Sequence, residues 1–433
     1  MTKTKVAIVG MGTVGTGVAR LLLDHGDRTA RHAGRTLWLE EVVVRDLDKP
    51  RAADLPAGIL STDLSRITNH PEIKVVAQLI GGLEPARSIM LKLLESGKDV
   101  VTANKALLAE YGGELFDAAR QLGRSIAFEA SVAGGIPIIT NISQCFTANQ
   151  ILSIRGILNG TSNFIVTEME ERGMEYAQAV GAAQERGYAE ADPAMDVDGT
   201  DAAQKLGILA HLAFGARVHW SEIPRVGIDQ LAVSDLRFAR ELGYRIKLLA
   251  LAQLTDGVLE LSVAPTFIKI GQPMAEVRGA NNAISVVGDA VGRVFFHGLG
   301  AGRMPTASAV VADMIDTAVG RTQLTFHTLK LWSGQEPRFG IRAHEHLRGR
   351  FYLRFTVRDD PGVMSRITGA LGRHEVSIAS VIQHEPDERG DGALVPLVIM
   401  THMTTEGATA AAVEEIDEMY CTRQHSVRMR VLD

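Results

Sequence analysis

The feature that most constrains the fold is the alternation of short β-branched segments with helical patterns up to residue 130. Segments between the β-branched runs, such as EPARSIMLKLLESG, space their apolar residues as a helix does and end at a glycine. Strands that alternate with helices form a parallel sheet covered by helices, so residues 1–130 are predicted to form a Rossmann-type, doubly wound α/β domain. The predicted strands are Lys5–Val9, Leu39–Val44, Lys74–Ile80, Asp99–Ala103 and Arg124–Ala130.

A glycine-rich turn joins the first predicted strand to the first predicted helix. The stretch VAIVGMGTVGTGVARLLL places Gly10, Gly12 and Gly15 in the order G-x-G-x-x-G, with Thr13 and Val14 before the last glycine. Glycines allow a tight turn there, and the helix N-terminus offers N–H groups to a pyrophosphate. The turn is therefore predicted to bind a dinucleotide, and the alternative is a glycine turn that only packs.

The end of the second predicted strand indicates which dinucleotide is bound. Arg45 comes first in VVVRDLDKPR, and Lys49 and Arg51 follow it. A guanidinium can pair with a 2'-phosphate, which favours NADP(H). Asp46 keeps NAD(H) open, because a carboxylate can bind the ribose hydroxyl instead. A solvated basic turn is the other alternative.

The rest of the chain divides into further predicted parts. Residues 131–303 are rich in helices and then in strand-like runs, such as RIKLLALAQL and VLELSVAPTFI, which predicts a separate α+β domain. A helix over 304–320 is predicted to return and complete the first domain. Residues 334–349 are predicted to be a linker, and residues 350–433 show the order of strands and helices of a ferredoxin-like domain.

Composition narrows the class of protein. A chain of 433 residues is too long for one compact core, and a net charge of −6 argues against nucleic-acid or anionic membrane partners. The two cysteines, Cys145 and Cys421, are far apart and predict neither disulfides nor structural zinc. Because no signal peptide and no apolar run of about 18 residues is found, we expect a cytoplasmic protein with small-molecule partners.

One segment joins an acidic loop to an apolar helix that contains an aspartate and a lysine. In ERGYAEADPAMDVDGTDAAQKLGILAHLAFG, Asp201 and Lys205 are four residues apart and so share one face. Apolar neighbours all round predict that the pair lies inside or at a cleft wall, where charges are costly without partners. The alternative is a surface ion pair of roughly 0.3–0.5 kcal/mol.

Two other segments carry candidate site residues. Lys105 follows a predicted strand at the edge where ligands bind in open α/β sheets, although a solvated lysine opening a helix fits equally well. Glu129 ends the last predicted strand, and the glycines of EASVAGGIPII break the chain before a helix that starts at Ile136–Pro137. Carbonyl groups in such a segment can ligate a hard cation, but most such turns do not.

Taken in order, the motifs resemble those of homoserine dehydrogenases that carry a C-terminal ACT domain. The resemblance spans nearly the whole chain and implies NAD(P)-dependent interconversion of L-aspartate 4-semialdehyde and L-homoserine, in threonine and methionine biosynthesis. It implies that residues 131–303 bind substrate and form a homodimer or homotetramer. The motifs are VGMGTVG, TANKALLA, EASVAGGIPII, ILNGTSNFI, GYAEADPAMDVDGTDAAQKLGILA, GLGAGRMPTASAVVAD and the ACT-like FTVRDDPGVMSRITGALGRHEVSIASVIQ.

The resemblance also implies roles for individual residues. The catalytic residues it implies are Lys205, Lys105 and Asp201, and the substrate-binding residues are Glu190, Asn159, Gly160 and Thr161. The expected cofactor-binding residues are Gly10, Gly12, Thr13, Val14, Gly15, Arg45, Lys105 and Gly302. A monovalent cation, Na⁺ or K⁺, is implied at Glu129, Val132, Gly134 and Ile136, largely through backbone carbonyls. Leu299 stands where many relatives have proline, which puts the nicotinamide-side contacts of its loop in doubt.

The chemistry of the reaction explains a charged pair within an apolar helix. Hydride reduction of an aldehyde builds negative charge on oxygen, so the site needs a cation and a proton donor beside it. A protonated Lys205 held by Asp201 supplies both, and Glu190 would neutralise the substrate's ammonium group. The substrate's carboxylate is expected to meet backbone N–H groups or Lys105. The sequence leaves open which lysine transfers the proton.

Two other functions fit parts of the sequence. An aspartate-semialdehyde dehydrogenase would need a cysteine nucleophile, and Cys145 lies in an apolar helical stretch without a recognisable histidine partner. A non-catalytic sensor built from Rossmann and ACT domains would not need Lys105, Glu190, Asp201 and Lys205. Both alternatives are therefore weaker than the dehydrogenase.

The C-terminal region predicts regulation. By resemblance, residues 350–433 form an ACT domain that binds an amino acid, and L-threonine is the expected inhibitor. Asp359, Asp360 and Gly362 lie at a strand-to-helix turn, where a carboxylate can meet helix N–H groups and an aspartate can meet an ammonium. ACT domains often pair edge to edge, so the ligand is expected to depend on assembly. The alternative is a domain that only dimerises.

Overall fold

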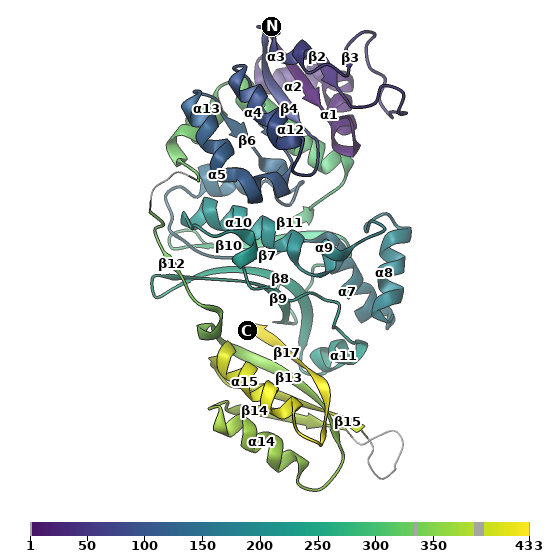
Figure 1. Cartoon of the computed structure of the whole chain (residues 1–433), viewed down its shortest axis with the longest axis vertical. Coiled ribbons are helices and arrows are strands. Elements are labelled where there is room, and N and C mark those ends of the chain that lie inside the picture. The colour runs from purple at the N-terminus through teal and green to yellow at the C-terminus, as the bar shows by residue number, and fades with distance from the viewer. Residues whose placement is uncertain (1, 333–335, 385–393, 433) are drawn as a thin grey trace. The chain divides into compact units, whose positions relative to one another are not determined.

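The computed structural model describes residues 2–332, 336–384 and 394–432 (Figure 1). By their contacts, these residues form two compact units. Unit 1 consists of Met1–Gly160, Asp201–Ile223 and Ala280–Gly340. Unit 2 consists of Thr161–Thr200, Pro224–Gly279 and Ile341–Asp433. Each unit is therefore assembled from segments that are distant in the sequence.

Unit 1 contains the predicted parallel sheet, with strand order β3-β2-β1-β4-β5-β6. This order confirms the doubly wound Rossmann-type fold. The strands are β1 (Lys3–Val9), β2 (Thr36–Val43), β3 (Leu60–Ser61), β4 (Ile73–Gln78), β5 (Asp99–Thr102) and β6 (Ile126–Ala127).

The predicted strand Arg124–Ala130 is wrong in its length. Only Ile126–Ala127 pair as β6, and Glu129–Ser131 form the short 3-10 helix η1. The strand ends because the backbone N–H of Glu129 donates to Oδ2 of Asp313 at 2.8 Å. A side chain from a distant helix thus takes the donor that a longer strand would have used.

Helices cover the parallel sheet of unit 1. Helix α12 lies against α1 so closely that a Cβ at Gly17 would come within 2.8 Å of the Cβ of Ala307. Val310 and Met314 on α12 join the buried cluster of the sheet, so this late segment completes the core of the N-terminal fold. The helices are α1 (Thr13–Asp24), α2 (Gly26–Ala33), α3 (Ser65–Thr68), α4 (Ala86–Glu95), α5 (Lys105–Gln121), α12 (Arg303–Ala318) and α13 (Arg321–Leu329).

The rest of unit 1 holds a second group of strands. Strands β7 (Ile151–Ile157), β10 (Asn281–Gly288) and β11 (Gly292–Leu299) pair antiparallel in the order β11-β10-β7. The predicted helix after the glycine pair begins later than expected, as α6 (Ile138–Thr140), and continues as the π-helix η2 (Asn141–Cys145). Helix α10 (Thr200–Phe214) and η3 (Trp220–Glu222) complete the unit.

Unit 2 contains the other predicted helices and a long hairpin. The helices are α7 (Gly160–Arg172), α8 (Tyr176–Glu185), α9 (Ala194–Val197) and α11 (Val233–Glu241). Strands β8 (Tyr244–Thr255) and β9 (Val258–Lys269) pair antiparallel over their whole length. The runs RIKLLALAQL and VLELSVAPTFI were predicted as strands, and the hairpin confirms both.

The C-terminal part of unit 2 has the predicted ferredoxin-like order. Its antiparallel sheet has the order β17-β13-β15-β14, and the final strand β17 also pairs with β9 in parallel, with Arg430 opposite Thr266. The elements are β13 (Arg348–Arg358), α14 (Val363–Arg373), β14 (Ile378–Gln383), β15 (Leu394–Thr401), β16 (Thr404–Thr405), α15 (Glu406–Asp417) and β17 (Thr422–Leu432).

Two sequence predictions concern segments that the structure describes only in part. The predicted linker 334–349 contains β12 (Gly340–Ile341) and η4 (His344–His346), while its residues 334–335 lie outside the described residues. The charged loop HEPDERGDG also lies outside them after His384. Among the described helices, none combines the length and apolar character needed to cross a membrane.

Candidate active site

The glycine-rich turn of unit 1 has the geometry of a dinucleotide site. Gly10 has φ +100°, and a Cβ at Gly15 would lie 2.1 Å from the carbonyl oxygen of Gly10. The turn therefore excludes side chains at both positions. Gly12 caps α1, and no atom lies within 4 Å of the place its Cβ would take. The helix N-terminus thus faces open space in which a pyrophosphate can approach the backbone.

Two arginines after β2 differ in how well their side chains can reach a ligand. Arg51 donates through Nη1 to the carbonyls of Leu47 at 3.0 Å and Lys49 at 2.8 Å, so its guanidinium turns into its own loop. Arg45 is exposed, directly after the buried Val44 at the end of the strand region. Of these two arginines, Arg45 is the better placed for a 2'-phosphate.

A second site in unit 1 is built around the carboxylate of Asp201. Its Oδ2 lies 2.7 Å from Nζ of Lys205 and accepts a hydrogen bond of 2.9 Å from the Asn159 amide, and its Oδ1 lies 3.0 Å from Nζ of Lys105. Lys205 also donates to the carbonyl oxygen of Leu158 at 2.7 Å. One carboxylate therefore joins two lysines that come from different helices.

Burial and charge act in opposite directions on Asp201. The side chain is 8% exposed, and burial alone would raise the pKa of the carboxyl, but the positive charges of Lys205 and Lys105 hold that pKa well below its ordinary value. Asp201 is thus a carboxylate at any pH near neutrality. The prediction that Asp201 and Lys205 form an inside pair rather than a surface ion pair is confirmed by their burial, since Lys205 is only 12% exposed.

Local structure explains how Lys105 reaches this carboxylate. Lys105 is the first residue of α5, and the Asn104 side chain caps that helix by accepting the N–H of Leu107 at 3.0 Å. The same amide donates to the carbonyls of Ile80 at 3.0 Å and Gly82 at 2.6 Å, which fixes the turn. The side chain of Lys105 is 35% exposed, so it remains accessible to a ligand.

Of the other predicted substrate residues, Thr161 and Glu190 belong to unit 2 and Gly160 to unit 1. The hydroxyl of Thr161 donates to the carbonyl oxygen of Tyr188 at 2.8 Å, which ties the start of α7 to the acidic segment. Glu190 is exposed in that segment, and its backbone carbonyl accepts from the Gln184 amide at 3.2 Å. Gly160 opens α7 directly after Asn159.

The predicted cation segment of unit 1 contains a buried carboxylate, that of Glu129, which accepts hydrogen bonds from the backbone. The Glu129 carboxylate accepts the N–H of Ile139 at 2.8 Å and the N–H of Thr140 at 2.7 Å. Burial raises the pKa of Glu129, and burial together with the charge of Glu129 raises the pKa of Asp313 well above its ordinary value. In the described ranges no three His, Cys, Asp or Glu side chains gather for a metal, so a cation at Glu129, Val132, Gly134 and Ile136 depends on carbonyl oxygens.

The loop after β11 packs backbone to backbone on the glycine pair. The N–H of Gly135 donates to the carbonyl oxygen of Leu299 at 3.1 Å, and a Cβ at Gly134 would lie 2.8 Å from the carbonyl oxygen of Gly300. Gly302 caps α12 with φ +115°. The glycines thus bring the predicted cation segment and the predicted nicotinamide-side loop together.

Several site features have no signal in the sequence pattern. The contacts of Lys105 and Asn159 with Asp201 join residues that are far apart in the chain, and only the fold brings them together. The acid pair of Glu129 and Asp313 is of the same kind. The motif ILNGTSNFI implied a substrate-binding role for Asn159 by resemblance, but it did not indicate that Asn159 contacts an aspartate.

Comparison with known proteins identifies the family. The model described as "Homoserine dehydrogenase, NAD binding domain" matches residues 10–129, "Homoserine dehydrogenase" matches residues 137–315, and "ACT domain" matches residues 351–419. The homoserine dehydrogenase of Synechocystis sp. is 42% identical over 441 residues, with 99% of each chain covered. The chain belongs to the homoserine dehydrogenase family. The Pseudomonas aeruginosa homoserine dehydrogenase is 41% identical and covers 100% of this chain and 99% of its own.

Solved structures agree with this assignment. A homoserine dehydrogenase from Thiobacillus denitrificans matches with a TM-score of 0.89 at 41% identity, covering 100% of this chain and 99% of that one. A hyperthermophilic archaeal homoserine dehydrogenase in complex with NADPH matches with a TM-score of 0.62 at 25% identity, over 73% of this chain and 98% of that one. The chain is thus an oxidoreductase with an NAD(P)-binding domain and a C-terminal ACT domain, as its motifs predicted.

Proposed function

We propose that Asp201, Lys205 and Lys105 form the catalytic centre that interconverts L-homoserine and L-aspartate 4-semialdehyde. The observation that carries this proposal is the single buried carboxylate that contacts two lysines through different oxygens. A buried carboxylate that holds two lysine side chains in place provides preorganised donors where an alkoxide develops. The arrangement therefore favours the state of the reaction in which the substrate oxygen is negative.

Lys205 is proposed to exchange the proton. Its ammonium group has three N–H donors, of which two meet Asp201 and the carbonyl of Leu158, so the third remains for the substrate oxygen. When homoserine is oxidised, its hydroxyl proton passes to the neutral amine of this lysine. The carbon that carries this hydroxyl gives up a hydride in the same reaction. NADP⁺, when bound, supplies the hydride acceptor. In the reverse direction the protonated lysine returns the proton to the alkoxide.

The substrate's other groups are assigned to neighbouring segments. Glu190 is proposed to bind the ammonium group, and Lys105, which is more exposed than Lys205, to bind the carboxylate. The loop Asn159–Thr161 would shape the site, since Asn159 orients Asp201 and Thr161 is tied to the acidic segment. These assignments give each charged group of the amino acid a partner of opposite charge.

The cofactor is proposed to be NADP(H), with Arg45 as the partner of the 2'-phosphate. The exposure of Arg45 supports this choice, and a relative of this chain has been solved with NADPH. Gly10, Gly12, Thr13, Val14 and Gly15 would cradle the pyrophosphate. Glu129, Val132, Gly134 and Ile136 are proposed to hold Na⁺ or K⁺, largely through backbone carbonyl oxygens. Comparing turnover in KCl or NaCl with turnover in choline chloride tests this site.

We also propose that L-threonine inhibits the enzyme through the ACT domain. The turn before α14 is exposed, Gly362 caps that helix with φ +89°, and Asp359 accepts a hydrogen bond from Gln383 at 3.0 Å. The strand β14 ends the sheet and carries exposed residues, which suits edge-to-edge pairing in a homodimer or homotetramer.

The deciding experiment measures reduced nicotinamide formed from L-homoserine by the purified full chain, with NADP⁺ and NAD⁺ compared. Turnover with NADP⁺ at the lower Michaelis constant is expected. The same assay with added L-threonine should show inhibition that disappears in a truncation ending near Gly340. A chain that binds dinucleotide without oxidising homoserine would overturn the catalytic assignment, and inhibition that survives truncation would move the threonine site elsewhere.

A further inference from the structure

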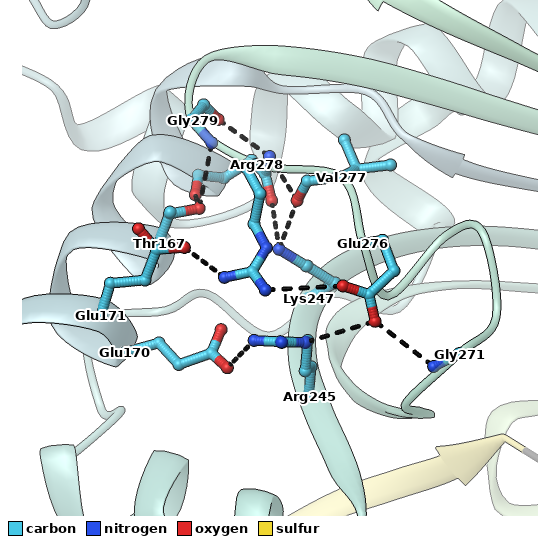
Figure 2. A network of polar contacts seen from close by, with 11 residues as sticks. Thr167, Glu170, Glu171, Arg245, Lys247, Gly271, Glu276, Val277, Arg278 and Gly279 are labelled. Atoms are coloured by element: carbon cyan, nitrogen blue, oxygen red, sulfur yellow. Dashed lines mark hydrogen bonds and ion pairs between the residues drawn. The ribbon is translucent and has the colours of Figure 1, made fainter.

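Unit 2 contains a completely buried lysine. This residue is distant along the sequence from the predicted catalytic residues. Lys247 lies on β8 with 0% of its surface exposed. Its Nζ donates to the carbonyl oxygen of Val277 at 2.6 Å and to Oδ1 of Asn163 at 3.1 Å (Figure 2). Both of these acceptors are neutral, so an ammonium group is held by oxygen atoms that carry no formal charge.

The acidic residues around Lys247 pair with arginines. Glu170 on α7 pairs with Arg245, and Glu171 pairs with Arg278 (Figure 2). Glu276 lies 3.6 Å from Arg245 and 3.5 Å from Arg278. Each acid therefore has an arginine within ion-pair distance, and the buried ammonium sits inside a ring of charges that compensate one another.

Burying the charged group of this lysine lowers the stability of the fold. Burial lowers its pKa to about 8, because the charged form loses its hydration and the nearby arginines oppose it. An apolar side chain of similar length would fill the same place on β8 without removing a charge from water. The reason for a lysine at this position therefore lies in the hydrogen bonds that its ammonium group makes.

The ammonium group holds the start of α7 to the segment after β9. Asn163 accepts from Lys247 and donates through its amide to the carbonyl oxygen of Gly279 at 2.8 Å. The N–H of Gly279 in turn donates to the hydroxyl of Thr167 at 3.2 Å. The lysine thus completes a network between residues 277–279 and the first two turns of α7.

We infer that Lys247 is a positioning residue for the substrate loop Asn159–Thr161, acting through Asn163. Helix α7 begins at Gly160, so Asn163 lies in its first turn and its position sets the path of the loop just before it. This inference rests on the proposed role of the loop in substrate binding. Lys247 does not touch the substrate, and its contribution is to hold the loop in its binding geometry.

The main test replaces Lys247 with methionine, which keeps the unbranched shape and most of the length of the side chain but removes every donor. The Michaelis constant for L-homoserine should rise about tenfold, because small displacements of a positioning loop are costly. The Michaelis constant for NADP⁺ should stay within about twofold, since the glycine-rich turn belongs to unit 1. Lys247→Arg should recover part of the affinity for homoserine if donors at this place are what matter.

A second variant keeps the test decisive if Lys247→Met does not fold. Asn163→Ala removes the acceptor of Lys247 and the amide donor to Gly279 without adding a buried group. It should raise the Michaelis constant for homoserine at least as much as Lys247→Met does, because Lys247 acts through this residue. Where both variants fold, the double variant should be no worse than Asn163→Ala alone, because the two residues act on the loop in series. Glu276→Gln is the matched control, since Glu276 contacts the arginines and the N–H of Gly271, and should leave this constant unchanged.

Two outcomes would overturn the inference. If Lys247→Met and Asn163→Ala lower only the melting temperature and leave the constant for homoserine unchanged, Lys247 is purely structural. Additive effects in the double variant would show that Lys247 does not act through Asn163. Asn159→Ala separates this failure from a failure of the proposed loop: if it also leaves homoserine binding unchanged, the role of the loop itself is wrong.

Discussion

Two lysines, one in each unit, differ in the charge of the groups that hold them. In unit 1, Lys205 is 12% exposed and lies 2.7 Å from the carboxylate of Asp201. In unit 2, Lys247 is fully buried and donates to a carbonyl and an amide oxygen. The pKa of Asp201 falls well below its ordinary value, while the pKa of Lys247 falls to about 8. The partner, more than the burial, decides whether a buried charge is stable.

The comparison also separates two uses of a lysine. Lys205 has a charged partner on one side and remains slightly exposed, so its charge is available to a reacting oxygen. Lys247 spends its donors on the backbone and side chain of its own unit, so it acts on the shape of the molecule. Replacing each of the two should therefore affect different kinetic constants.

The largest expected effect is that of Lys205→Ala. Turnover should fall at least roughly a hundredfold in both directions, the low end for losing a positioned acid or base. Steady-state rates of homoserine oxidation and semialdehyde reduction measure this, with the melting temperature as a check on folding. A variant that keeps near wild-type turnover in either direction would remove Lys205 from proton transfer and would break the distinction between the two lysines.

The second expected effect concerns stability at alkaline pH. Lys247 has a pKa of about 8 when folded and an ordinary value of 10.5. Between these values the unfolded chain binds more protons, so stability rises with pH, by up to roughly 3 kcal/mol. The groups that face the ammonium are Glu170 and Glu171 on α7, Arg245 on β8, and Arg278 with Glu276 on the segment after β9.

Denaturant unfolding at several pH values tests this effect against Lys247→Met. Below pH 8 the cost of burying the charge is fully present in the wild type, and it is relieved as the pH rises through 8 toward 10.5. The wild type should therefore gain stability relative to the methionine variant over this range. Parallel curves for the two proteins would mean that burial does not lower the pKa of Lys247.

The same contrast explains what the sequence could reveal. Asp201 and Lys205 are one helical turn apart, so their spacing placed them on one face, and the apolar residues around them favoured burial over a surface ion pair. Lys247 lies in the run RIKLLALAQL, which predicted a strand but gave no indication of the network around its ammonium. Its acceptors, Asn163 and Val277, come from segments that only the tertiary fold brings to β8.

The fold was predictable wherever local pattern and topology agree. Strands alternating with helices predicted the parallel sheet, and the order of the last elements predicted the ferredoxin-like domain. The prediction was wrong at Arg124–Ala130, where a hydrogen bond from Glu129 to Asp313 ends the strand. The interleaved segments of the two units come together through long-range packing, which has no local signal in the sequence.

The smallest expected effect concerns the surface charge that is proposed to select the cofactor. Arg45 is exposed, so its pairing with a 2'-phosphate would be screened by water, and Arg45→Ala should raise the Michaelis constant for NADPH by only roughly three- to tenfold. The constant for NADH should change much less, because NADH lacks that phosphate. Arg51→Ala is the matched control, since its guanidinium is bound to the carbonyls of Leu47 and Lys49. Equal effects of Arg45→Ala on both cofactors would mean that Arg45 serves only the fold at the end of the strand. If only Arg51→Ala changed the preference between NADPH and NADH, Arg51 rather than Arg45 would be the partner of the 2'-phosphate.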